Sequence, residues 1–88
     1  STVALIISER FEEIILAIEE KLDRGVTILE GRGGYSGEKK QVLLCAIRRR
    51  QVPQLKSIVR EIDPEAFVIL QEAHQVLGEG FRRNGDEM

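Results

Sequence analysis

Glycines and cations are concentrated in the stretch EGRGGYSGEKKQ, residues 30–41. Successive backbone N–H groups in a glycine-rich turn can form a concave site for an anion. Arg32, Lys39 and Lys40 would complete such a site with positive charge. The same composition also fits a β-hairpin whose glycines allow positive φ angles and whose lysines keep the tip soluble. The residue types leave both interpretations open.

Two familiar nucleotide motifs are excluded in this stretch. Gly31 and Gly33 begin a GxG pattern, but Ser36 stands where GxGxxG requires its last glycine. The stretch also precedes a predicted strand instead of opening a helix. A Walker loop needs GK followed by Ser or Thr, whereas Gly37 is followed by Glu38.

A second basic cluster, Arg48–Arg50, follows the apolar run of residues 42–47. It is either a phosphate-facing group or a solvated strand end. Side chains alternate along a strand, so Arg48 and Arg50 are expected to share a face that Arg49 does not. One continuous site from all three arginines is therefore not expected.

No set of residues points to catalysis, and we expect the chain not to be an enzyme. His74 has no partner at zinc-ligand spacing, and Cys45 lies among aliphatic residues as a core side chain would. Arg10 follows the first predicted strand, as in an acylphosphatase loop, but the glycines of such a loop are missing. An RNA-recognition domain would need aromatic residues in its third strand, and VLLCAI has none.

Composition sets the class of protein. The chain has 88 residues, of which 42% are hydrophobic, which suits one small domain. Its formal charge of −2 argues against nucleic acid as a partner. No apolar run reaches the length of a membrane span, no signal peptide is recognised, and one cysteine cannot form an internal disulfide. The absence of an initiator methionine leads us to expect a piece of a longer protein.

The order of elements predicts a ferredoxin-like βαββαβ fold, in the α+β class. We expect strands at residues 1–8, 26–31, 42–47 and 65–73. Ser8 is expected to cap a first helix that stops at Gly25, and a second helix runs from Pro53 to Asp63 before Pro64. In this topology the first and third strands are central. We expect residues 1–81 to form one domain and residues 82–88 to be a disordered tail.

Two helices cover only one face of a four-stranded antiparallel sheet, yet VLLCAI is apolar on both of its faces. We expect the second face to pack against another subunit or another domain of the parent chain. The alternative is that the segment HQVLGEGF, residues 74–81, folds back over it.

Three segments together resemble one bacterial family: GRGGYSG, IRRRQVPQLKSIVREIDPEAFVIL and QVLGEGF. They are similar to the small cytoplasmic domain at the C-terminus of YitT-type membrane proteins. The resemblance implies a cytoplasmic domain of an inner-membrane protein, tethered to a membrane portion outside this chain. The fold is also similar to that of PII-type signalling proteins, which assemble through their sheets and bind nucleotides between subunits near the loop joining strands two and three.

This resemblance leads to a functional hypothesis: a regulatory module that binds a small anion, such as a nucleotide, at a subunit interface. Backbone N–H groups of Gly33, Gly34 and Ser36 would hold phosphate, Lys40 would neutralise it, and Tyr35 would stack. The expected ligand-binding set also contains Gly31, Arg32, Arg48, Arg50, Gly80 and Phe81, the last two within residues 78–81. No other cofactor is expected. The alternative is a homo-oligomerisation module without a small-molecule ligand.

Overall fold

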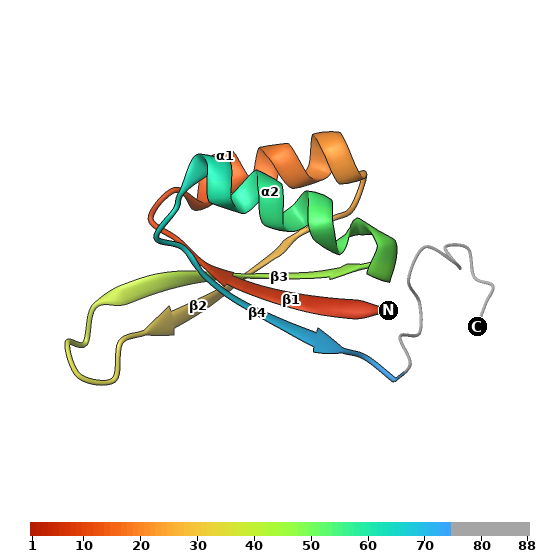
Figure 1. Cartoon of the computed structure of the whole chain (residues 1–88). Helices are drawn as coiled ribbons and strands as arrows, with labels where there is room; N and C mark the ends of the chain where they lie inside the picture. The colour runs from red at the N-terminus through yellow and green to blue at the C-terminus, as the bar shows by residue number, and fades with distance from the viewer. Residues whose placement is uncertain (75–88) are drawn as a thin grey trace.

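The computed structural model describes residues 1–74, which form one sheet covered on one side by two helices (Figure 1). The strands are β1 (Thr2–Ile7), β2 (Thr27–Arg32), β3 (Lys39–Ile47) and β4 (Phe67–Glu72). The helical elements are α1 (Phe11–Ala17), its π-helical continuation η1 (Ile18–Leu22), the 3₁₀ turn η2 (Arg49–Gln51) and α2 (Val52–Ile62). Expectations for residues 75–88, including the tail and the end of the domain, lie outside the described residues.

The sheet has the strand order β2-β3-β1-β4, and every neighbouring pair is antiparallel. The predicted ferredoxin-like fold is confirmed, with β1 and β3 in the centre. β3 begins at Lys39, three residues earlier than predicted, because its first residues pair with the end of β2 through Arg32 and Lys39.

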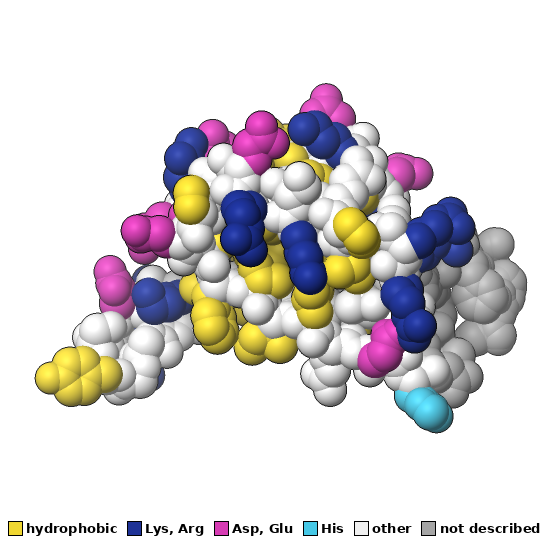
Figure 2. Space-filling view, in the orientation of Figure 1, with side chains coloured by type: hydrophobic (Ala, Val, Ile, Leu, Met, Phe, Trp, Pro, Cys, Tyr) yellow, Lys and Arg dark blue, Asp and Glu magenta, His cyan; other side chains and the backbone are white. Residues whose placement is uncertain are grey.

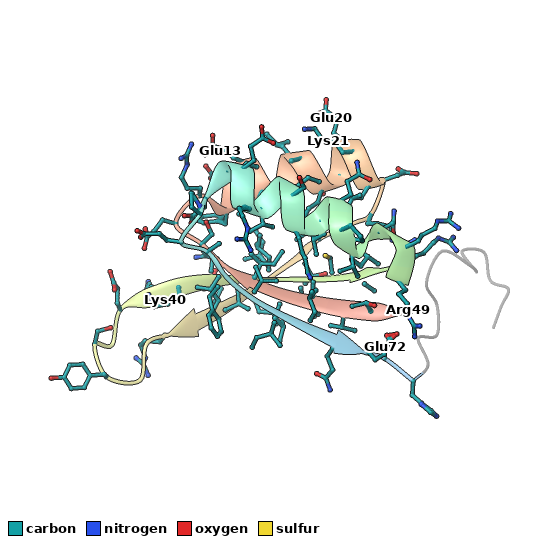
Figure 3. The ribbon with its side chains drawn as sticks, in the orientation of Figure 1. Glu13, Glu20, Lys21, Lys40, Arg49 and Glu72 are labelled. Carbon is teal, nitrogen blue, oxygen red and sulfur yellow. The ribbon has the colours of Figure 1, made fainter. Side chains whose placement is uncertain are left out.

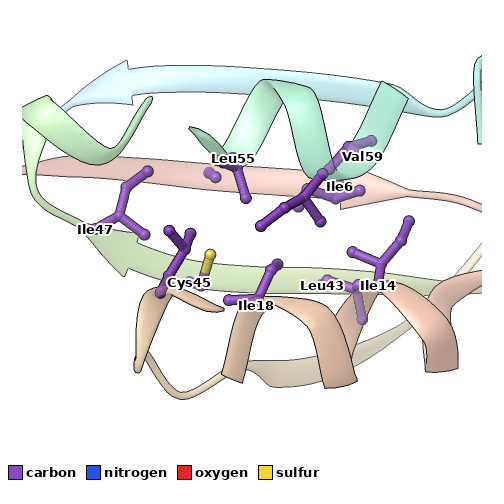
Figure 4. Packing of buried hydrophobic residues seen from close by; sticks show 11 residues of the cluster. Ile6, Ile14, Ile18, Leu43, Cys45, Ile47, Leu55 and Val59 are labelled. Carbon is purple, nitrogen blue, oxygen red and sulfur yellow. The ribbon is translucent and has the colours of Figure 1, made fainter. Parts of the chain in front are cut away.

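The core lies between the sheet and the helices (Figure 4). Alternate residues of β1 and β3 point into it, and α1, η1 and α2 contribute apolar side chains at helical spacing. The largest fully buried side chains are Ile6, Ile14, Ile18, Leu43, Ile47 and Leu55. Cys45 is also buried there, as the sequence predicts, and burial raises the pKa of its thiol.

The first helix begins and ends differently from the prediction. Its N-cap is Arg10, without a side-chain cap hydrogen bond, so Ser8 is not the helix cap. Ser8 Oγ instead accepts a hydrogen bond from the Arg10 N–H at 2.8 Å, within the turn before the helix. The helix ends at Asp23, whose φ of 57° is left-handed, and not at Gly25. Aspartate tolerates this conformation better than most residues, so the glycine is not needed for the stop.

The second helix matches its prediction. Pro53 lies in the first turn of α2, where its missing N–H is harmless. Asp63 is the C-cap, and Pro64 prevents continuation. The buried residues of this helix are Leu55, Ile58 and Val59.

Candidate functional site

The glycine loop is a β-hairpin in which several backbone groups form hydrogen bonds within the loop itself. The Gly33 N–H donates to the Glu38 carbonyl at 2.8 Å, and the Gly37 N–H donates to the Gly33 carbonyl at 2.9 Å. Ser36 Oγ accepts from the Glu38 N–H at 3.1 Å. The Gly33 N–H is thus committed inside the turn and is not free to hold phosphate, which removes it from the expected anion cradle.

Two of the four glycines are explained by the hairpin itself. Gly37 has a φ of +75°, a region that side chains of L-residues rarely adopt. A Cβ at Gly33 would lie 2.7 Å from Ser36 Oγ. A Cβ at Gly34 would meet nothing within 4 Å, so that glycine is not required by the turn. Tyr35 is fully exposed at the tip of the hairpin.

At the base of the hairpin, the two strands form a cleft of about 360 Å³. Three cationic side chains and one carboxylate line it, so it favours a negatively charged ligand. Lys40 is partly neutralised already, because its Nζ lies 3.8 Å from Glu38 Oε1. The lining residues are Glu30, Gly31, Arg32, Lys39, Lys40 and Gln41.

A second cleft of about 490 Å³ adjoins the first and shares Lys39, Lys40 and Gln41 with it. Four segments build it: the end of β1, the turn before α1, the start of β3 and the turn between α2 and β4. The sequence offered no signal for it, because these segments are far apart in the chain. The other residues around it are Ile7, Ser8, Glu9, Arg10, Phe11, Asp63, Glu65 and Phe67.

A polar network closes the wall of this larger cleft. Ser8 Oγ donates to Asp63 Oδ2 at 2.6 Å, and Asp63 Oδ1 accepts from the Glu65 N–H at 2.9 Å. These two hydrogen bonds, the one from Ser8 foremost, hold the pKa of Asp63 below its usual range. Arg10 is paired with Glu13 at 2.6 Å. The larger cleft therefore carries charges of both signs, and its Arg10 and Asp63 are already partnered. It suits an anion less than the hairpin cleft does.

The other expected ligand residues do not join this site. Arg48 and Arg50 follow the far end of β3, nine residues from the hairpin end at Lys39. At about 3.3 Å per residue this separates them from the hairpin by over 20 Å. Figure 3 shows this arrangement, with Lys40 near one end of the molecule and Arg49 at the other. Gly80 and Phe81 lie outside the described residues.

The face of the sheet away from the helices is apolar across all four strands. The strand register places the side chains of three rows on this face, and their hydrophobic members protrude below the sheet in Figure 2. We call this surface the open face; its apolar residues are Val3, Leu5, Ile7, Leu29, Val42, Leu44, Ala46, Phe67 and Ile69. Phe67 is 59% exposed, and Leu29 and Ile69 are 44% and 43% exposed. The apolar second face expected from VLLCAI is thus present.

Metal binding and membrane crossing find no support within residues 1–74. No three His, Cys, Asp or Glu side chains gather there as they would around a metal ion. In the same part of the chain, no helix is long and apolar enough to cross a membrane.

Fold and surface together define a ferredoxin-like domain with an exposed apolar sheet face and a cationic hairpin cleft. Residues 24–78 match the family model described as an uncharacterized protein conserved in bacteria, DUF2179. The chain belongs to this family, which confirms the resemblance found in the sequence.

Relatives connect the family to membranes. The chain is 42% identical over 83 residues to the UPF0750 membrane protein YvjA of Bacillus subtilis, covering 94% of this chain and 30% of that protein. It is 32% identical over 75 residues to the UPF0750 membrane protein YitT of the same organism, covering 85% of the chain and 27% of that protein. The chain thus spans less than a third of these two relatives. Their names describe no catalytic activity.

A crystal structure of a DUF2179 protein from Eubacterium ventriosum shares the fold. It superposes with a TM-score of 0.70 and 30% identity, covering 80% of this chain and 96% of that one. A domain of this size can therefore be studied by itself.

Proposed function

We propose that this domain assembles its parent membrane protein by pairing two copies through the open face. The observation that carries the proposal is the width of the apolar surface, which extends from Leu29 on β2 to Phe67 and Ile69 on β4. Monomeric proteins rarely leave a contiguous apolar surface of this extent in water. Fully burying one aliphatic or aromatic side chain of this kind contributes about 1.5–3 kcal/mol.

A second copy is the occupant that the charge pattern favours. Most oligomers are symmetric, and a twofold interface brings the same patch of both subunits together. A charged patch would repel its own copy, but among residues 1–74 the only charged side chain that the register places on the open face is Lys40, at one corner. Thr27 and Gln71 are its other polar side chains, and both lie on edge strands. Two such sheets can pack face to face about 10 Å apart.

Sedimentation equilibrium on the chain at micromolar concentrations tests this proposal. We expect a dimer for the natural sequence and a folded monomer for Phe67→Lys/Ile69→Lys, which places two charges on the open face. The control is Leu16→Lys, which places one charge on the helical side, where Leu16 is 66% exposed. A natural chain that sediments as a monomer throughout, or a control that dissociates equally, would contradict the proposal.

A second function, binding of a small anion such as a nucleotide, is favoured by the hairpin cleft. Arg32, Lys39 and Lys40 surround it, and Lys40 also belongs to the open face, so a ligand there would lie beside a paired subunit. The N–H groups of Gly34 and Ser36 lie in the same hairpin as this cleft. A module that senses an anion through its dimer would use both surfaces.

Thermal unfolding with ATP or inorganic triphosphate at millimolar concentration checks this second function. A ligand that binds only the folded state raises the melting temperature as its concentration increases. We expect a rise for the natural chain that disappears in Lys39→Gln/Lys40→Gln. Lys56→Gln/Arg60→Gln removes the same charge from the exposed side of α2 and is expected to keep the rise. An equal response of both variants, or none in the natural chain, would refute the anion site.

A further inference from the structure

The end of the sheet opposite the hairpin presents three consecutive exposed arginines. We call this surface the arginine end and define it as Arg48–Arg50. β3 stops at Ile47, so the strand alternation expected to separate Arg49 from its neighbours does not apply. Arg48 is the extended N-cap of η2, and Arg49 and Arg50 lie in that turn. Figure 2 shows Lys and Arg side chains gathered where β3 passes into α2.

The turn is held by hydrogen bonds that do not involve the guanidinium groups. The Arg48 N–H donates to Gln51 Oε1 at 2.9 Å, and the Gln51 N–H donates to the Arg48 carbonyl at 2.8 Å. Gln51 Nε2 also donates to the Leu22 carbonyl at 3.1 Å, which fixes the turn to the end of η1. The backbone is thus built independently of the three cationic side chains.

Two of these cations have no partner in the described part of the chain. Arg49 pairs with Glu72 through its Nε at 2.9 Å and through a second contact from its guanidinium (Figure 3). Neither Arg48 nor Arg50 makes a side-chain hydrogen bond or an ion pair with any of residues 1–74. Within residues 1–74, the arginine end therefore carries two guanidinium groups that no carboxylate neutralises.

The path of the chain brings both ends of the described fold to the same place. Thr2 pairs with Ile47 and with Glu72, and the Ala73 N–H donates to the Ser1 carbonyl at 2.8 Å. The chain enters β1 and leaves β4 beside the arginine end (Figure 1). A connection to a membrane portion through either end of the fold would start from this side of the domain.

We propose that the arginine end lies against the membrane of the parent protein and binds the phosphates of anionic lipid headgroups. The proposal rests on the family's membrane relatives and not on dimer formation or ligand binding. A guanidinium group binds phosphate through two parallel hydrogen bonds, and anionic leaflets attract basic segments close to the bilayer. This contact fixes the orientation of the domain, with the arginine end toward the lipid and the hairpin cleft toward the aqueous phase.

The orientation is also compatible with a dimer. A twofold axis parallel to the strands brings two open faces together and leaves both arginine ends on the same side. Two tethered copies can then contact one membrane.

The test anchors the 88-residue chain by an N-terminal histidine tag to nanodiscs that carry a nickel-chelating lipid and a gadolinium-labelled headgroup. One set of discs contains phosphatidylcholine alone, and the other also contains phosphatidylglycerol. Broadening of backbone amide signals reports the distance of each residue from the lipid surface. With phosphatidylglycerol, we expect the broadening at residues 48–51 to increase at least twofold relative to residues 33–37. This increase should be lost in 0.5 M salt, where exposed charges more than about 4 Å apart are screened.

Two variants that lose equal charge distinguish an effect of the arginine end from an effect of the overall charge of the domain. Arg48→Gln/Arg50→Gln is expected to show the phosphatidylcholine profile on both discs, whereas Lys39→Gln/Lys40→Gln, which removes equal charge at the hairpin, keeps the lipid-dependent increase. Because the salt dependence is measured on the natural chain, it tests the proposal even if a variant fails to fold. Identical profiles in both lipids would overturn the proposal and favour an acidic protein segment as the partner. A loss of the lipid-dependent increase in the lysine variant would also overturn the proposal.

Discussion

At the scale of residues, Ser8 and Asp63 join the start of α1 to the end of α2. They are 55 positions apart, so the sequence gives no local sign of their contact. Ser8 was expected to cap a helix, and its hydroxyl instead stabilises the carboxylate of Asp63 while accepting the Arg10 N–H. The pair matters for the larger cleft because it fixes two of its walls.

This pair predicts a specific pH dependence of stability. The pKa of Asp63 is lower in the folded than in the unfolded chain, so its contribution is complete above the unfolded pKa of about 3.9 and disappears as pH falls through the folded value. Ser8→Ala is expected to raise the pKa of Asp63, to destabilise the domain at pH 7, and to destabilise it less at pH 2. Carboxyl NMR titration and urea unfolding at both pH values measure these effects. Ser57→Ala, on the exposed side of α2, is the control; an unchanged Asp63 pKa in Ser8→Ala would disprove the coupling.

At the scale of elements, the hairpin separates the glycines needed for folding from those available for a ligand. Gly37→Ala places a side chain at positive φ and is expected to lower the free energy of unfolding by about 1–2 kcal/mol. Gly34→Ala is the control, because its Cβ would meet nothing, and it should be neutral or slightly stabilising. Denaturant unfolding of both variants measures the difference. Equal losses would contradict this assignment of the two glycines.

Elements were predictable from the sequence where the signal is local. Periodic apolar residues and Pro64 located α2 within a residue or two, and the order of elements gave the topology. The end of the first helix was misplaced because Asp23 adopts the left-handed conformation that a glycine usually marks. The turn at Arg49–Gln51 was missed because an arginine run carries no turn signal. As a result, Arg49 was expected to lie on a different face from Arg48 and Arg50.

At the scale of the whole molecule, the open face is expected because the two helices can cover only one of the two sides of the sheet. Two helices cover one side of the sheet, and β1 and β3 are apolar on both sides, so the sequence alone predicts an uncovered apolar layer. The clefts were harder to predict from the sequence. The hairpin cleft was expected from its glycines and lysines, but the larger one forms only when distant turns meet at one end of the sheet.

The most direct measurement of the central claim is an isotope-filtered NOE experiment on an equal mixture of labelled and unlabelled chains. It detects only contacts between different molecules. We predict intermolecular NOEs that involve methyl groups of Leu5, Leu44 and Ile69 on the open face, and none that involve the core residues Ile18 and Leu55. The absence of intermolecular NOEs from the open face would contradict the account. So would contacts of its methyl groups with residues 75–81 of the same chain in a conventional, unfiltered NOE spectrum.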